Sequence, residues 1–171
     1  TDAAGFSVTS EYAAHGEVTA VARTPSDGSN AGQTLITQMI YDALGRKVAM
    51  NDPDKGLISY RYNALGELTQ QTDAKGQVQS LYYDALGRIY HKEQTRYAAA
   101  DSPLGTGHAI DFEFDTAPLG STGRLALGQL ATSSLANGNY VKNIDYDELG
   151  RTVQLRTQID GQTFYQRVIF D

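Results

Sequence analysis

The chain has 171 residues, 40% of them hydrophobic and 20% charged, with 17 glycines, 11 tyrosines and a formal net charge of −6. This composition is compatible with one folded domain or with one segment of a larger array. The negative charge, with no basic stripe to neutralise phosphates, argues against nucleic acid or an anionic membrane as a partner. The chain contains no cysteine, which excludes disulfides and thiolate sites within it, and no apolar run approaches the roughly 20 residues of a membrane helix.

The beginning of the chain is expected to be a diverged copy of a pattern that is clearer further on. Residues 6–12 and 17–23 are predicted to be extended, with a turn that ends at Gly16 between them. Glycine, proline, serine and aspartate dominate residues 24–32, which predicts a polar loop insertion. Residues 33–41 then lead into the first complete copy.

The same short phrase occurs four times: a tyrosine, an aspartate or asparagine, any residue, a leucine and a glycine. Its first three copies are spaced by 21 residues, and such self-similarity predicts a repeat architecture. Short runs of Tyr, Val, Leu, Ile and Thr between Gly and Asp/Asn clusters predict one β-hairpin per copy, with the acid or amide bonded to the turn and glycine at positive φ. We assign the signature a structural role, in the turns and in packing between copies. Its residues are Tyr41, Asp42, Gly45, Arg46, Tyr62, Gly66, Tyr83, Asp84, Gly87, Arg88, Tyr146, Asp147, Gly150 and Arg151.

An arginine follows the turn glycine in several copies. Arg46, Arg88 and Arg151 are examples, and Arg124 is predicted to occupy the same position in a longer copy. We expect these arginines to pair with turn acids of adjacent copies, in an exposed ladder worth about 0–1 kcal/mol per pair. Glutamate replaces the arginine at position 67, so the charge pattern is not strict.

The spacing changes after the third copy. Residues 97–109 are rich in small residues, glycine and proline, which predicts a connecting loop. Residues 110–115 alternate between apolar side chains and acids, the clearest strand signal in the chain. Phe114 opens an expanded copy whose turn is predicted to end at Gly123-Arg124-Leu125, and Phe170-Asp171 resembles the start of a further copy.

These elements predict an all-β protein of about 13 strands, in which tandem hairpins form a curled or spiralling antiparallel ribbon. Curling is expected because a twisted open sheet of more than about 10 strands tends to curl, split or flatten. The predicted organisation is repeats at 1–96 with the insertion at 24–32, a connecting loop at 97–109, and further repeats at 110–171 that are truncated at the C-terminal end.

Tandem Tyr-Asp-Ala-Leu-Gly-Arg phrases at this spacing resemble the YD repeat of the Rhs family, which also occurs in the B and C components of Tc insecticidal toxins and in animal teneurins. The resemblance implies a β-ribbon that forms part of a larger shell enclosing a toxic C-terminal effector. It also implies a secreted or cell-surface bacterial protein connected with virulence. The implied partners are neighbouring repeats of the same or a partner shell protein and the effector. The alternative is a carbohydrate-binding or adhesive module with glycans as partners.

No enzyme, cofactor or metal site is predicted. The three histidines, His15, His91 and His108, are far apart in sequence and lack metal-ligand spacing. Asp52-Pro53 superficially resembles the Asp-Pro-x-Gly motif of self-cleavage regions in the family, but its position favours a turn. The acids at 111–115 are interpreted as a solvated strand face, with weak Ca²⁺ binding as the alternative.

Overall fold

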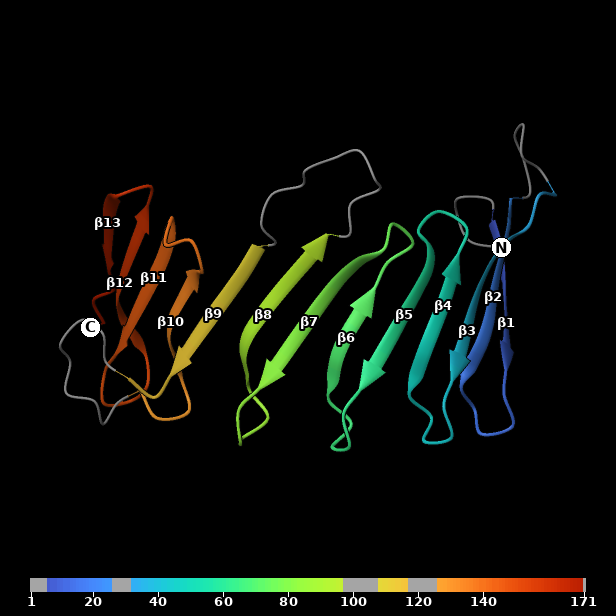
Figure 1. The fold of residues 1–171 in the computed structure, drawn as a ribbon, viewed down its shortest axis with the longest axis horizontal. Coiled ribbons are helices and arrows are strands. Elements are labelled where there is room, and N and C mark those ends of the chain that lie inside the picture. The colour runs from blue at the N-terminus through green and yellow to red at the C-terminus, as the bar shows by residue number, and fades with distance from the viewer. Residues whose placement is uncertain (1–5, 26–31, 97–107, 117–125, 171) are drawn as a thin grey trace. The chain divides into compact units, whose positions relative to one another are not determined.

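The computed structural model describes residues 6–25, 32–96, 108–116 and 126–170, which form thirteen β-strands and no helix (Figure 1). The hydrogen-bonded order of the strands follows the sequence, and the pairs described are antiparallel, so the predicted all-β antiparallel fold is confirmed. Accordingly, no helix in the described ranges is long and apolar enough to cross a membrane. The strands are β1 (Phe6–Tyr12), β2 (Val18–Pro25), β3 (Leu35–Tyr41), β4 (Lys47–Asp52), β5 (Gly56–Tyr62), β6 (Leu68–Thr72), β7 (Gln77–Tyr83), β8 (Ile89–Arg96), β9 (His108–Phe114), β10 (Leu130–Leu135), β11 (Tyr140–Tyr146), β12 (Thr152–Ile159) and β13 (Gln162–Arg167).

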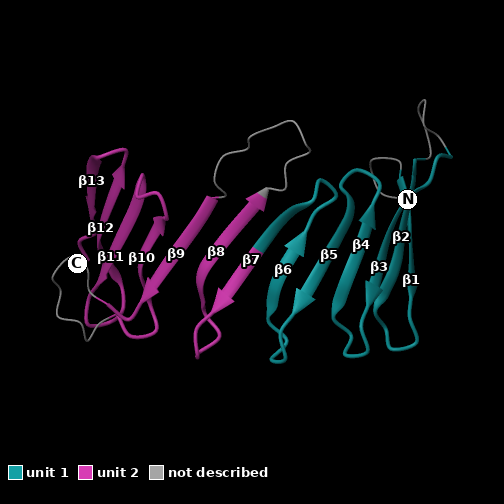
Figure 2. Cartoon of the chain, in the orientation of Figure 1, with its two compact units in different colours: residues 1–79 teal, residues 80–171 magenta. Residues whose placement is uncertain are grey.

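The chain divides into two compact units, residues 1–79 and residues 80–171, with the division inside β7 (Figure 2). Within each unit, the described strands contact only their neighbours in sequence, so each unit is a single open sheet. The predicted curling is therefore not found within either unit. The predicted division into 1–96, 97–109 and 110–171 stays a prediction, and residues 97–107 lie outside the described part of the chain.

A β-bulge lies immediately before most of the signature tyrosines. The register shifts between Ile40 and Tyr41, between Arg61 and Tyr62, and between Asp145 and Tyr146. Each of these tyrosines consequently pairs with the second residue after the turn glycine, as Tyr62 does with Leu68. A bulge increases the local twist and redirects the next side chain. The bulges therefore direct the side chains of these tyrosines toward the preceding repeat.

The sheet has very little buried interior. In the described residues, only Ala20, Ile58, Ala126 and Ala131 are buried apolar residues, and no large side chain is fully buried. Stability must therefore come from rows of side chains across neighbouring strands. One such row in the first unit joins Met39 to Met50 and Met50 to Ile58.

Candidate functional site

Each signature turn is organised by the side chain of its aspartate or asparagine. In the turn between β3 and β4, Asp42 Oδ1 accepts hydrogen bonds from the backbone N–H groups of Leu44, at 2.9 Å, and Arg46, at 3.0 Å. Gly45 closes the turn by donating its N–H to the Asp42 carbonyl at 3.0 Å, with φ of 75°. Glycine adopts that backbone conformation at no steric cost. The same arrangement recurs at Asn63, Asp73, Asp84 and Asp147.

The arginine of each turn pairs first with the aspartate of its own turn. Arg46 Nε donates to Asp42 Oδ2 at 2.7 Å, and the equivalent bonds of Arg88 and Arg151 have the same length. The predicted ladder of ion pairs between copies is therefore wrong for Arg46 and Arg151. Successive signature turns are two strands apart, about 10 Å, whereas the tight turn brings residues four apart into contact. Arg124 lies outside the described residues.

The same arginines also extend forward to the aromatic residue of the next repeat. The Arg46 guanidinium lies 5.0 Å from the centre of the Tyr62 ring, and its Nη1 donates to the Asn63 carbonyl at 3.2 Å. Arg151 lies over the ring of Phe170 at 4.1 Å. A guanidinium at these distances is attracted by the electron-rich face of the ring. Phe170 thus occupies the position of a signature tyrosine.

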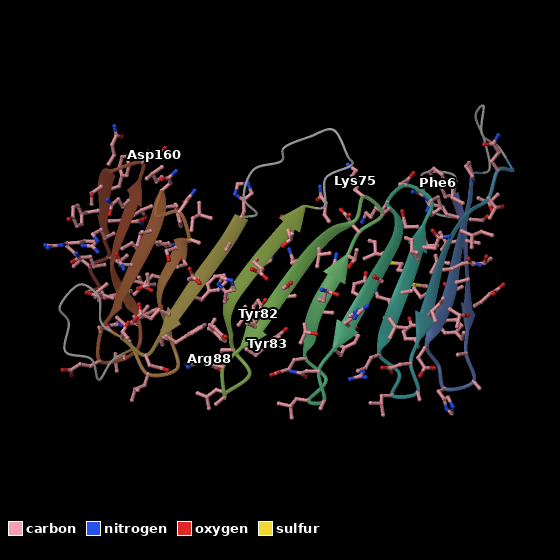
Figure 3. The ribbon with its side chains drawn as sticks, in the orientation of Figure 1. Phe6, Lys75, Tyr82, Tyr83, Arg88 and Asp160 are labelled. Atoms are coloured by element: carbon pink, nitrogen blue, oxygen red, sulfur yellow. The ribbon has the colours of Figure 1, made fainter. Side chains whose placement is uncertain are left out.

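Arg88 makes the most extensive of these forward contacts, inside the second unit. It lies over the Phe114 ring at 4.4 Å and donates Nη1 and Nη2 to the two carboxylate oxygens of Asp115, at 3.1 and 2.8 Å. Figure 3 shows Arg88 at the turn that follows Tyr83, the residue that ends β7. Among the described arginines, Arg88 alone forms the predicted ion pair with the acid of another copy.

The signature tyrosines reach in the opposite direction, to the preceding repeat. Three hydroxyl groups donate to backbone carbonyls at 2.8 Å: Tyr41 to Val18, Tyr62 to Lys47, and Tyr146 to Leu130. Each acceptor is the second residue after a turn glycine. We use the word clasp for the contacts that the two residues after a turn glycine make with the aromatic residue and the turn of the next repeat, as Arg46 and Lys47 do with Tyr62 and Asn63.

Two clasps use a residue other than arginine. Gln129 Nε2 donates to the Gly150 carbonyl at 3.2 Å, and a Cβ atom on Gly150 would lie 2.7 Å from that nitrogen. Glu17 Oε1 approaches Gly45 in the same way, 3.3 Å from where a Cβ atom would be. Here the turn glycine is needed both for its positive φ and for space beside the preceding repeat.

The turn of the expanded repeat ends at Gly128, so the predicted end of this turn at Gly123-Arg124-Leu125 is wrong. Asp115 donates its N–H to the Gln129 carbonyl at 3.2 Å, and its Oδ1 accepts from the Gly128 N–H at 2.6 Å. Gly128 has φ of 78°. The sequence signal that identifies this turn is Ala126-Leu127-Gly128, which repeats the Ala-Leu-Gly of the regular copies.

Hydrogen bonds lower the pKa of the turn carboxyl groups. For Asp42 and Asp84 the largest cause is the backbone N–H of the arginine four residues later. The Arg88 guanidinium is the main cause of the lowered pKa of Asp115. For Asp147, burial raises the pKa, but the backbone and side-chain hydrogen bonds of Arg151 outweigh it and the net shift is downward. The turns therefore hold these carboxylates in the ionised form.

The other sequence candidates are placed apart from the clasps. Asp52 lies at the turn between β4 and β5, where its Oδ1 accepts from the N–H groups of Asp54 and Lys55. His91 Nδ1 lies 2.6 Å from Asp111 Oδ1. Within the described ranges, no three His, Asp or Glu side chains are grouped so as to hold a metal ion.

Comparison with known proteins agrees with the repeat pattern. Residues 62–101 match the family model described as RHS Repeat, which confirms the recognition of Rhs repeats from the sequence, and no curated protein matches the chain. The crystal structure of TcdB2-TccC3-Cdc42 is similar with a TM-score of 0.59 and 17% identity, over 99% of this chain and 10% of that chain. TcdB2-TccC3 is similar with a TM-score of 0.59 and 16% identity, over 97% of this chain and 10% of that one. TcdB2-TccC3 without its hypervariable C-terminal region has a TM-score of 0.58 and 16% identity, over 98% and 10%. At these identities the likeness shows a shared fold, and this chain spans about a tenth of the length of those chains.

Proposed function

We propose that this chain of Rhs repeats is a structural segment of the wall of a bacterial toxin shell, which encapsulates or scaffolds a toxic C-terminal effector. The observation that carries the proposal is the clasp, because Tyr41, Tyr62 and Tyr146 make the same bond to the preceding repeat. A contact that recurs from repeat to repeat serves the continuity of the ribbon rather than a reaction at one place. The fold likeness to TcdB2-TccC3 supports the same proposal.

In this role the chain needs no catalytic group, and we propose that it is not an enzyme. Its partners are neighbouring Rhs repeats, of the same or another shell protein, and the effector. The turn carboxylates are engaged in hydrogen bonds with their own turns, which supports a structural use of these acids. The protein that contains the chain is secreted or lies on the bacterial cell surface.

Deletion of one repeat from the full-length protein tests the proposal. Removing residues 62–82 joins Arg61 to Tyr83, so the signature phrase stays intact while one hairpin is lost. We expect the effector to become sensitive to protease and its delivery to fall. A deletion of 24–32, the insertion predicted from sequence, serves as the control. Full protection of the effector after removal of the repeat would show that the chain is not shell wall.

A second candidate function, glycan binding, rests on a separate cluster in the second unit. Tyr82 and Tyr90 are 41% and 46% exposed, with ring centres 6.4 Å apart, and the Tyr82 hydroxyl donates to Glu93 Oε1 at 2.8 Å (Figure 3). Exposed aromatic faces beside carboxylates suit the apolar faces and hydroxyl groups of sugars. On a glycan array, Tyr82→Ala should abolish any saturable binding, whereas Tyr165→Ala on β13 should not. If the wild-type chain binds no glycan, this candidate is excluded.

A further inference from the structure

An apolar groove of about 530 Å³ lies on one face of the sheet in the second unit. A volume of this size is in the range of small-molecule sites, which are mostly apolar with a few polar groups. Strands β7 to β10 form its walls, and the apolar side chains that line it are Leu81, Tyr83, Ile89, Phe112, Phe114 and Leu130. The clasp at Phe114 occupies only one end of this groove.

One charged residue, the half-buried Lys92, belongs to the wall of this groove. Lys92 pairs with Ile110 across β8 and β9. Phe112 and Phe114 follow Ile110 at alternate positions of β9, so they share its face, whereas the acids between them face the other way. Within the described ranges, Lys92 forms no ion pair. Its ammonium group is therefore available to an anion bound in the groove.

The neighbouring cation, Arg88, is already neutralised at the turn end of the strands (Figure 3). Its guanidinium lies 2.7 Å from Asp84 Oδ2 and 2.8 Å from Asp115 Oδ2. Ile89 begins β8 directly after this arginine, and Lys92 follows three residues later, which is about 10 Å along an extended strand. The groove thus has an apolar end beside the clasp and a positively charged end at Lys92.

We propose that this groove binds a medium-chain fatty acid, with the carboxylate at Lys92 and the alkyl chain extending past Phe112 toward Phe114. The proposal goes beyond the role of a shell wall and does not depend on it. A fully extended chain covers about 1.2 Å per bond, so about 10 Å of groove accommodates an acid of roughly eight carbons. An alkyl chain suits the apolar walls, and a single carboxylate matches the single lysine.

A polypeptide suits the groove less well than a fatty acid does. Strands β8, β9 and β10 each lie between two other strands, so their backbone groups are engaged within the sheet. A peptide laid on this face would leave amide groups in an apolar site without hydrogen-bond partners, which is costly. A fatty acid has its polar atoms at one end only, where the Lys92 ammonium group supplies the donors.

Calorimetric titration with sodium hexanoate, octanoate and dodecanoate, each below its micelle concentration, tests the length of the site. Burial of each CH₂ group should strengthen binding about fourfold, so octanoate should bind roughly fifteenfold more tightly than hexanoate. Dodecanoate should bind little more tightly than octanoate, because its additional carbons extend beyond the groove. The absence of saturable octanoate binding would overturn the proposal, and so would a constant gain per carbon through dodecanoate.

Substitution of the lysine tests the position of the carboxylate. Lys92→Met keeps an unbranched apolar stem and removes the charge, so octanoate affinity should fall about tenfold or more, while the affinity for octan-1-ol should stay the same. Lys142→Met is the matched control, since Lys142 lies on β11 outside the groove. Circular dichroism verifies that both variants keep the sheet. Unchanged octanoate binding in Lys92→Met, or an equal loss in Lys142→Met, would contradict the assignment.

Two other occupants give distinct results with the same variants. A short peptide of alternating leucine and aspartate that binds more tightly than octanoate, and only when Lys92 is present, would assign the groove to a polypeptide. Self-association of the chain that octanoate reverses, as measured by sedimentation, would assign it to a second copy. Either result would overturn the proposal. The deletion of residues 62–82 is a separate test: loss of effector protection there, without octanoate binding here, supports the shell wall and rejects the fatty-acid site.

Discussion

Two turns of very different length connect neighbouring strands in the same way. One runs from Asp42 to Arg46 in the first unit, and the other from Asp115 to Gln129 in the second. Both close with a backbone bond from the aspartate N–H to a carbonyl, at 2.9 and 3.2 Å. In the short turn the glycine N–H bonds to the Asp42 carbonyl, whereas in the long one the Gly128 N–H bonds to the Asp115 side chain. Asp115 itself has φ of 67°.

The long turn also receives the stronger contact from the preceding repeat. Arg46 donates one hydrogen bond to the Asn63 carbonyl, but Arg88 makes a two-pronged ion pair with Asp115. Bidentate arginine–carboxylate pairs are stronger and more specific in direction than single neutral bonds. The comparison indicates that a repeat tolerates a long connection between two strands when the first residue of that connection, here Asp115, is bound by the arginine of the preceding repeat.

Loss of the Arg88 side chain should destabilise the protein more than any other change considered, and more than loss of Arg46 does. Arg88→Met removes the bonds to Asp84 and Asp115 and the contact with the Phe114 ring. We expect a clearly larger fall in the urea midpoint than for Arg46→Met, which serves as the matched control. Hydrogen exchange should also accelerate in β9. Equal losses in the two variants would mean that the ion pair with Asp115 adds nothing.

Alanine at the turn glycines should destabilise both turns, and the effect at Gly45 should be at least as large, because a Cβ atom there would lie 3.3 Å from Glu17 Oε1 whereas the space beside Gly128 is open. Gly45 and Gly128 have φ of 75° and 78°, and the left-handed conformation costs an L-residue about 1–2 kcal/mol. Gly128→Ala should lower the free energy of unfolding by that amount and Gly45→Ala by at least that amount, as measured by urea denaturation. Leu44→Ala, in the same turn as Gly45, is the control for a substitution without strain. An unchanged free energy of unfolding in Gly128→Ala would show that the long turn can adopt another backbone conformation at this position without cost.

Removal of a tyrosine hydroxyl should have a smaller effect, and the same one in both units. Tyr62→Phe and Tyr146→Phe each delete one 2.8 Å bond to the preceding repeat and keep the ring. We expect a loss of about 1 kcal/mol for each in the free energy of unfolding. Tyr165→Phe, on the exposed strand β13, should change nothing measurable. An unchanged free energy of unfolding in Tyr62→Phe would show that the hydroxyl group contributes nothing to the clasp.

Lowering the pH should have the smallest effect on the stability of the chain. The pKa values of Asp42, Asp84 and Asp115 are lowered in the folded chain, so these groups stabilise it above their unfolded pKa of about 4. This contribution is lost as the pH falls through the lower, folded values. Melting temperatures should therefore be level near neutral pH and fall below about pH 4. Asp115→Asn should reduce that dependence, and an unchanged profile would contradict the assignment.

Local chemistry was readable from sequence where contacts are close along the chain. The bonds from Asp42 to residues two and four positions later follow from the Asp-x-x-Gly spacing, and the strand before Asp115 follows from its alternation. The bulges before Tyr41, Tyr62 and Tyr146 have no local sequence signal, because a bulge depends on how two strands pair. The expanded turn was predicted to end at Gly123-Arg124-Leu125, which carries the Gly-Arg pair of the regular copies, whereas the structure ends it at Gly128, after the Ala-Leu pair of those copies.

The sequence by itself determined the strand order, the turn chemistry and the recognition of Rhs repeats, which the family model matches at residues 62–101, because these depend on residues within one hairpin of each other. Only the tertiary structure decided that Arg46 reaches Tyr62 while pairing with Asp42, and that Tyr62 bonds to Lys47. Those contacts depend on the stacking of successive hairpins and on the bulge that redirects each tyrosine. Side-chain direction across neighbouring strands is a property of the assembled sheet, and a linear pattern does not contain it.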